Sequence, residues 1–269
     1  MSDPCDLSAI DAREHIEKKT LSPLELVDSC IARIEAVDGR LNAMVATCYD
    51  RAREEAVMAE KAVMQGQALG PLHGLPLGVK DLNVTKGLRT TFGSELHANF
   101  IPDNDERIIA DLRQAGAIVL GKTNTPEFAE DFVCEPTFRG VTLNPWNVGV
   151  TTGGSSGGAG AAVASGMVPL AHATDLGGSI RIPSACCGVF GLKPTTGLNP
   201  IGPNYMELAN GFNSDHVLTR SVRDSAAALD CSVGPLRGSR YQVRPSVKSY
   251  LEALDQRIPK LRIGVSRST

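Results

Sequence analysis

The sequence lacks several features that would each point to a particular class of protein. It has no run of about 18 apolar residues, which argues against a membrane-spanning helix. Its acidic first residues lack the apolar core of a secretory signal. Lysine and arginine number 27 against 30 aspartates and glutamates, so no basic surface for nucleic acid or anionic membranes is expected. We therefore expect a cytoplasmic protein whose partners include neither nucleic acid nor a membrane.

Metal-ligand and disulfide patterns are also missing. The chain has seven cysteines, an odd number, without a Cys-x-x-Cys spacing, and its five histidines are scattered. Free thiols in a reducing compartment are the expected consequence. We expect no metal and no other cofactor.

Helical and strand patterns alternate along the chain, which favours an α/β fold with a mixed, largely parallel central sheet covered by helices. Ser22 to Glu25 has the sequence of a capping box, with proline at the first helical position. The segment 199–215, rich in glycine, proline and asparagine, is expected to be a long loop. The patterns predict helices beginning after Ser22, over 47–65, over 106–115 with Asp103 or Asn104 as cap, from Thr125, over 159–165 and over 225–229, and strands over 77–79, 117–120 and 168–173.

Two glycine-flanked serines, Ser155 and Ser179, stand 24 residues apart. Gly177 and Gly178 before Ser179 allow backbone N–H groups to converge on one point, as an oxyanion hole requires. Ser179 is the candidate nucleophile, and Ser155 could relay its proton to a base. The alternatives are a plain Gly-Gly-Ser turn at Ser179 and a flexible loop around Ser155.

Lys80 is the candidate base, in an otherwise apolar run. At its ordinary pKa only roughly one lysine in 2,500 is neutral at pH 7. Apolar neighbours such as Val79 and Leu82 would lower that pKa by desolvation. The competing interpretation, on which the local sequence does not decide, is an ion pair between Lys80 and Asp81 at a strand end.

Two other motifs offer different interpretations of the glycine-rich segment. The stretch 154–158 formally matches the Gly-x-Ser-x-Gly nucleophile elbow, with Ser156 as nucleophile and Asp175 and His216 as partners. The residues before it are polar, whereas an elbow needs a preceding apolar strand. A phosphate-binding Gly-x-x-x-x-Gly-Lys motif is absent.

The sequence resembles the amidase signature family. The resemblance rests on three motifs in order: Gly78-Val79-Lys80-Asp81, the glycine-serine stretch 153–158 and the stretch 175–183. Flanking segments such as 71–76, 120–127 and 144–147 also match, and the likeness spans about residue 7 to the end. What it implies is one amidase signature domain over 1–269, with a helical segment 1–68, a catalytic core 69–235 and an extension 236–269.

The resemblance further implies an amidase that cleaves a carboxylic amide C–N bond, linear or cyclic, through an acyl-enzyme intermediate. Lys80, Ser155 and Ser179 would form a Ser–Ser–Lys triad, with a cis peptide before Ser155. Backbone amides of Leu176, Gly177 and Gly178, with that of Ser179, would form the oxyanion hole. Ser156, Asp175 and Arg181 would support the site. A small-molecule amide substrate is the expected partner, and a homodimer is left open.

Two further points concern length and subgroup. Family members are usually nearly twice as long, so the C-terminal half is expected to be missing after a strand at Leu261–Val265. Ile182 and the motif around His216 resemble stand-alone hydrolases of the 6-aminohexanoate cyclic-dimer hydrolase type. The alternatives are the glutamine-hydrolysing subunit of a tRNA-dependent amidotransferase, which usually has glutamine in place of Ile182, and a non-catalytic truncated family member.

Overall fold

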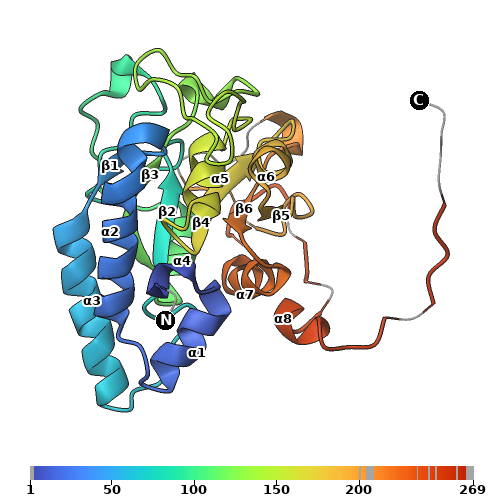
Figure 1. Ribbon diagram of the computed structural model, residues 1–269. Coiled ribbons are helices and arrows are strands. Elements are labelled where there is room, and N and C mark those ends of the chain that lie inside the picture. The colour runs from blue at the N-terminus through green and yellow to red at the C-terminus, as the bar shows by residue number, and fades with distance from the viewer. Residues whose placement is uncertain are drawn as a thin grey trace.

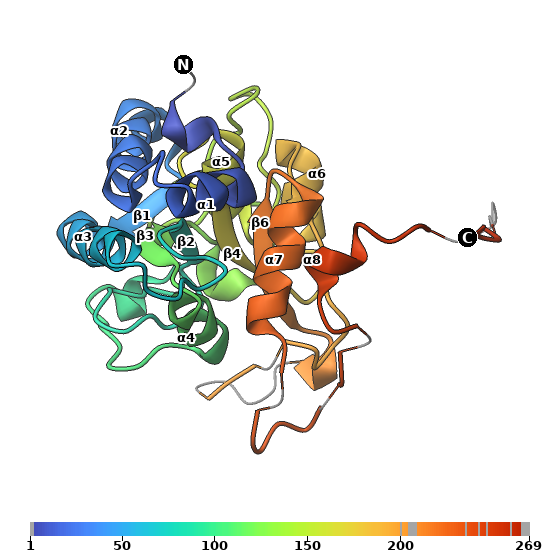
Figure 2. The same ribbon diagram turned by 90° about the horizontal axis from the view of Figure 1, so that it is seen from below.

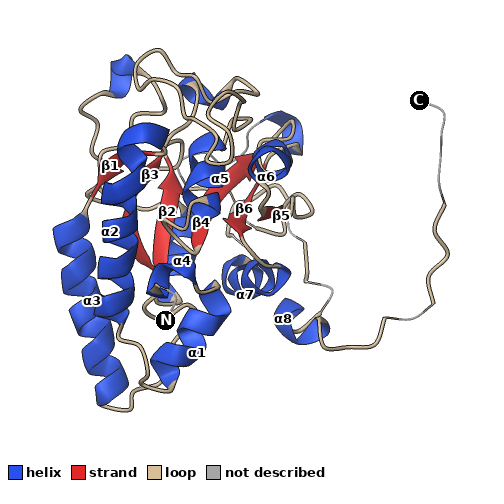
Figure 3. Ribbon diagram, viewed as in Figure 1, coloured by secondary structure: helices blue, strands red, loops and turns tan. Residues whose placement is uncertain are grey.

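The protein is described by a computed structural model that covers residues 3–199, 201–203, 209–234, 236–241, 243–245, 247–258 and 260–264. Within these ranges a six-stranded sheet is flanked by helices (Figure 1; Figure 3). The strands are β1 (Met44–Thr47), β2 (Pro76–Lys80), β3 (Ile118–Thr123), β4 (Leu170–Asp175), β5 (Phe190–Gly191) and β6 (Ser214–Thr219). The α-helices are α1 (Ala9–Glu17), α2 (Pro23–Leu41), α3 (Tyr49–Met64), α4 (Arg107–Gln114), α5 (Gly157–Ala164), α6 (Arg181–Cys187), α7 (Val222–Ser232) and α8 (Tyr250–Ala253).

The strand order is β1-β3-β2-β4-β6-β5. β2 pairs in parallel with both β3 and β4, and the other pairings are antiparallel. Every residue of β2, β3 and β4 is buried, as expected for strands covered on both faces. The mixed α/β sheet predicted from the sequence is confirmed. Because β2 and β4 are parallel neighbours, their last residues, Lys80 and Asp175, lie at the same edge of the sheet.

Local sequence signals explain where the helices begin and how closely they pack. The Ser22 side chain accepts a hydrogen bond from the Leu24 amide, and the Glu25 carboxylate accepts one from the Ser22 amide, which confirms the predicted capping box of α2. α5 contacts β4, β2 and β3 and consists only of glycine, alanine and valine. A Cβ atom on Gly158 would lie 2.3 Å from the Asn124 amide nitrogen, so this helix can approach the sheet only with glycine there. In Figure 2, α2 and α5 lie on one side of the strands and α4 on the other.

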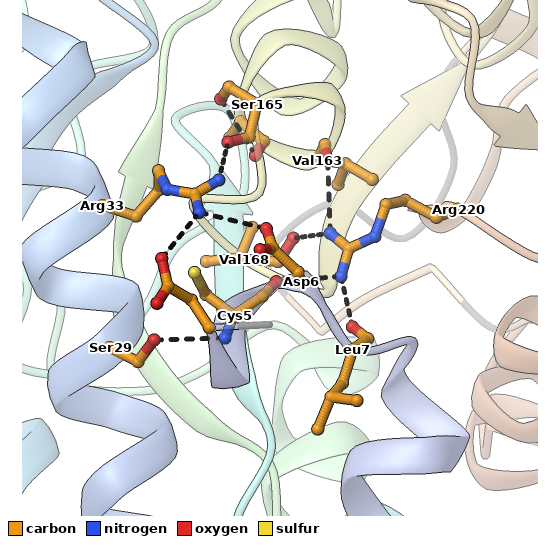
Figure 4. Close-up of polar contacts among 11 residues, drawn as sticks. Cys5, Asp6, Leu7, Ser29, Arg33, Val163, Ser165, Val168 and Arg220 are labelled. Atoms are coloured by element: carbon orange, nitrogen blue, oxygen red, sulfur yellow. Dashed lines mark hydrogen bonds and ion pairs between the residues drawn. The ribbon is translucent and has the colours of Figure 1, made fainter. Parts of the chain in front are cut away.

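Two arginines tie the N-terminal segment to the rest of the structure (Figure 4). The Arg33 guanidinium lies 3.0 Å from Asp6 and donates to the Ser165 carbonyl at 3.1 Å. Arg220 donates to backbone carbonyl groups of two distant segments, those of Cys5, Leu7, Val163 and Val168. Residues 5–7 are thereby held against the end of α5 and the start of β4.

The helix predicted over 106–115 is confirmed, but its predicted cap is wrong, and so is a second predicted helix. α4 begins at Arg107 with Glu106 as its N-cap, so Asp103 and Asn104 lie too far ahead to cap it. The helix expected from Thr125 is a single 3₁₀ turn over Glu127–Ala129. Phe128 and Ala129 have φ angles of 49° and 61°, left-handed conformations that cannot continue a right-handed helix.

The C-terminal part differs from expectation in two further ways. The predicted loop at 199–215 includes residues 200 and 204–208, which lie outside the described residues, and its last two positions already belong to β6. The predicted strand at Leu261–Val265 does not form over 261–264, and Val265 is not described. This segment runs away from the sheet (Figure 1), and among the described residues no strand lies beside it to pair with. Ile263 is accordingly 80% exposed.

Candidate active site

Lys80 ends β2 and is fully buried. Its ammonium nitrogen donates to Ser155 Oγ at 2.6 Å and to Thr174 Oγ1 at 2.9 Å. The neighbouring Asp81 accepts instead from the Thr91 amide and hydroxyl. Lys80 is therefore bound to hydroxyl groups, and the alternative of a hydrogen-bonded ion pair with Asp81 does not describe its contacts.

Burial lowers the pKa of Lys80 to about 7, although the charges of Asp215 and Asp175 act in the opposite direction. Neutral hydroxyl partners do not offset the loss of hydration as a carboxylate would. A lysine with this pKa is substantially unprotonated at neutral pH, and a neutral amine can accept a proton. The position thus has the protonation behaviour of a general base.

Ser155 and Ser156 lie just before α5, and the peptide bond between Gly154 and Ser155 is cis. Both serines are buried. Ser156 Oγ donates to the Thr174 carbonyl at 3.3 Å and accepts from the Thr174 amide at 3.4 Å. Ser156 therefore fixes the start of α5 to β4, while the preceding residue presents its hydroxyl to Lys80.

The segment between β4 and α6 carries Ser179 and the predicted oxyanion-hole residues. Gly178 has a φ of 142°, and a Cβ atom there would lie 2.7 Å from Ile182 Cδ1. The amides of Leu176, Gly177, Gly178 and Ser179 donate no hydrogen bond to another group in the part of the chain that the structure describes. They are thus available to a ligand oxygen.

Asp175 and Arg181 brace this segment. Arg181 Nε and Nη2 contact the two carboxylate oxygens of Asp175, each at 2.9 Å, and the Ile180 and Arg181 amides donate to Oδ2. Burial by itself would raise the pKa of Asp175, but these hydrogen bonds and the Arg181 charge bring it below its ordinary value. The ionised carboxylate holds the turn after Ser179 in place.

Ser155 and Ser179 line one cavity of about 590 Å³. The cavity lies at the carboxyl ends of β2 and β4, where crossovers in open α/β sheets commonly leave room for ligands. The structure thus brings together the three predicted catalytic positions: Lys80 hydrogen-bonds Ser155, and Ser155 shares the cavity with Ser179.

The residues of the nucleophile-elbow alternative, Ser156, Asp175 and His216, do not form a catalytic triad, because each has other partners. Ser156 is turned toward β4, Asp175 is paired with Arg181, and His216 Nε2 is 2.8 Å from Ser225 Oγ. Burial also lowers the pKa of His216 to about 3, which makes it a poor general base at neutral pH.

Sequence reasoning missed two groups around Lys80. Thr174 binds its ammonium directly, and Asp215 lines the cavity and lies opposite Thr174 in the β4–β6 pairing. Thr174 could have been found from its place directly before Asp175 at a strand end. Asp215 carried no such signal, because the strand β6 was itself not predicted.

Neither a metal-binding cluster nor a membrane-spanning helix is found in the ranges that the structure describes. No cluster of three or more histidine, cysteine, aspartate or glutamate side chains is placed to hold a metal ion in those ranges. None of the helices described there combines the length and hydrophobicity needed to cross a bilayer.

The fold and the buried Lys–Ser pair define an α/β protein with a serine-containing site. Comparison with known families identifies it: the family model described as Amidase matches residues 25–269, and the chain belongs to this family. An acylamidase of Rhodococcus erythropolis is 40% identical over 264 residues, 97% of this chain and 54% of the relative. A glutamyl-tRNA(Gln) amidotransferase subunit of Alkaliphilus metalliredigens is 37% identical over 265 residues, 97% of this chain and 53% of the relative.

Among solved structures, that of a 6-aminohexanoate cyclic dimer hydrolase complexed with substrate matches with a TM-score of 0.89 and 35% identity. The match covers 98% of this chain and 54% of that one. The family resemblance and the fold expected from the sequence are thereby confirmed. The chain spans about half the length of these curated relatives and of this structure.

Proposed function

We propose that this protein is an amide hydrolase that works through a Ser–Ser–Lys triad. Ser179 is the nucleophile, Ser155 the bridging hydroxyl and Lys80 the base. The observation that carries the proposal is the 2.6 Å hydrogen bond between the buried Lys80 ammonium and Ser155, in a site whose cavity also holds Ser179. What supports a catalytic role for this lysine is that its hydroxyl partner Ser155 opens into the same cavity as a second serine.

The reaction follows from these roles. Neutral Lys80 takes the proton of Ser155, Ser155 takes that of Ser179, and Ser179 Oγ bonds to the amide carbonyl carbon. The carbonyl oxygen becomes an oxyanion that the amides of Leu176, Gly177, Gly178 and Ser179 can bind. Return of the proton to the amide nitrogen breaks the C–N bond and releases the amine. Water then cleaves the resulting ester of Ser179 by the same proton path and releases the acid.

Ser156, Asp175 and Arg181 act in this scheme by positioning. Ser156 anchors the residue after the bridging serine to β4, and the Asp175–Arg181 pair anchors the turn that follows the nucleophile. None of the three needs to exchange a proton with the substrate.

Labelling with a fluorophosphonate probe, followed by intact mass measurement and peptide mapping, tests the proposal. We expect one adduct on Ser179 that is lost in the Ser179→Ala and Lys80→Ala variants. Lys18→Ala, at an exposed position of the N-terminal helical region, should label like the parent. A folded protein that takes up no probe would refute the proposal and favour a non-catalytic family member.

A second candidate is supported by the relatives named as glutamyl-tRNA(Gln) amidotransferase subunits, which match as well as the acylamidase does. In that case the substrate would be glutamine and activity would require a second protein. Ammonia release from glutamine that appears only when the other amidotransferase subunits are supplied would favour this candidate. Hydrolysis of simple amides by the protein alone would exclude the need for a partner.

A further inference from the structure

The cavity beside Ser179 has an aromatic wall. Phe92 and Phe100 stack with their ring centroids 6.0 Å apart, and the His97 ring meets Phe92 edge-on at 4.9 Å and Phe128 at 6.1 Å. All four rings line the cavity. Such a wall offers flat apolar faces on which a hydrocarbon or aromatic group can pack, and ring faces that also attract cations.

The carboxylates among the residues that line this cavity give it acidic character. Asp215, Glu106 and Glu130 line it, and its lining residues within the described ranges include no lysine or arginine. Asp215 and Glu106 are each only 1% exposed. Water therefore screens their charges far less than it would at the surface.

The contacts of Asp215 hold its carboxylate without neutralising it. Asn213 Nδ2 donates to one oxygen at 3.0 Å and Asn83 Nδ2 to the other at 2.9 Å, and both amides are uncharged. His172 Nε2 lies 3.7 Å away, but burial lowers the pKa of His172, so its ring is neutral at and above pH 7. Lys80 loses its own charge above a pKa of about 7. At mildly alkaline pH the cavity therefore keeps a negative charge beside the reacting serines.

We propose that this cavity selects amides that combine an apolar or aromatic group with a basic amine, and that it excludes amides with a free carboxylate. An ammonium group gains from the acidic lining and the ring faces, whereas a carboxylate would bring a second negative charge into the same poorly screened space. The inference rests on the proposed amidase function, because the cavity is the one that holds Ser155 and Ser179. Asp215 is then the buried residue that determines specificity, and Glu130 adds its charge from an exposed position of the cavity lining.

Three amides of matched length test this selectivity: the p-nitroanilides of heptanoic acid and of 7-aminoheptanoic acid, and the mono-p-nitroanilide of pimelic acid. They place a neutral, a cationic and an anionic end on the same chain. At pH 8 we expect kcat/KM to fall in the order cationic, neutral, anionic, with about tenfold or more between the first and the last. A pimelic compound that reacts as fast as the amino compound would overturn the proposal.

Two variants separate a cavity effect from the overall charge of the protein. Glu130→Gln removes an exposed carboxylate of the cavity lining and should reduce the cationic-to-anionic ratio by about twofold. Glu35→Gln, which removes an exposed carboxylate of α2 away from that lining, should keep the ratio. An equal drop in both variants, or in neither, would contradict the assignment of selectivity to the cavity.

Binding distinguishes failure of this inference from failure of the proposed function. The three amides are titrated calorimetrically into the Ser179→Ala variant, in which turnover plays no part. The same order of affinities supports the charge selectivity even if the parent protein hydrolyses none of them, a result that would refute the proposed function alone. Equal affinities, or tighter binding of the pimelic compound, would refute the inference.

Discussion

The Lys80 ammonium and the Ser155 hydroxyl are 2.6 Å apart although 75 positions separate them in the chain. Lys80 ends a central strand, and Ser155 immediately precedes the residue that caps α5. Thr174, at the end of the adjacent parallel strand, holds the same ammonium from a second direction. Three segments thus converge on one buried nitrogen. Its protonation can be measured through the pH dependence of activity and of stability.

The first prediction concerns the pH dependence of activity. Burial lowers the pKa of Lys80 to about 7, and in the proposed mechanism the unprotonated amine is the active base. The kcat/KM for an uncharged amide should therefore rise with pH and level off above a midpoint near 7. Asp215→Asn should move this midpoint to lower pH, because the charge of Asp215 favours the protonated lysine. A midpoint near 10 would show that another arrangement activates the serine.

The second prediction concerns stability. The pKa of Lys80 falls on folding from 10.5 to about 7, so its protonated form is destabilised in the native state. This cost is complete below pH 7, shrinks between pH 7 and 10.5 and vanishes above. Lys80→Met should therefore abolish activity yet raise the free energy of unfolding at pH 7, by an amount of the order of 3 kcal/mol. Urea denaturation across this pH range measures the difference.

The exposed lysine Lys18, paired with Glu14 on α1, provides the control for this measurement. Lys18→Met should change the free energy of unfolding by less than about 1 kcal/mol, with no trend between pH 7 and 10.5. A Lys80→Met protein that is less stable than the parent at pH 7 would contradict the assigned desolvation cost.

The third prediction compares two glycines. In Gly178→Ala the new Cβ would meet Ile182 Cδ1 at 2.7 Å, at a φ of 142° that residues other than glycine rarely adopt. We expect a loss of about 1–3 kcal/mol in stability, together with loss of fluorophosphonate labelling, because the turn that presents Ser179 must shift. In Gly39→Ala, inside α2, the Cβ meets no atom within 4 Å.

Gly39→Ala should accordingly stabilise the protein by about 0.5–1 kcal/mol through helix propensity and leave labelling intact. Thermal melts and labelling of both variants check the comparison. Unchanged labelling in Gly178→Ala would mean that this backbone conformation is not needed for the reaction.

The fourth prediction concerns the N-terminal segment. Arg220→Ala removes the donor for the carbonyl groups of Cys5 and Leu7 and for two carbonyls beside α5. Because these partly buried carbonyls then lose their partner, we expect a cost of about 2–4 kcal/mol and faster hydrogen exchange in residues of α1. Arg223→Ala breaks only an exposed ion pair with Asp255, 3.3 Å long, and should change stability by less than about 0.5 kcal/mol. Equal effects in the two variants would show that Arg220 does not anchor this segment.

The sequence alone determined the elements whose signals are local. The capping box at Ser22, the apolar strands around Val79 and Val119 and the glycine-alanine helix after Ser156 follow from residue chemistry within one turn or strand, and the structure confirms them. The family also followed from the sequence, because its glycine and serine motifs are short and contiguous.

Only the tertiary structure decided what depends on neighbours from elsewhere in the chain. β6 escaped prediction because its six buried residues include four polar ones, among them Asp215 and His216, so no hydrophobic period marks it. The segment 261–264 has the residues of a strand but no strand beside it, and backbone groups become a strand only when a partner supplies the hydrogen bonds. Likewise, the sequence placed Lys80 in an apolar run, but only its full burial against Ser155 and Thr174 lowers its pKa, because desolvation depends on atoms that the fold brings together.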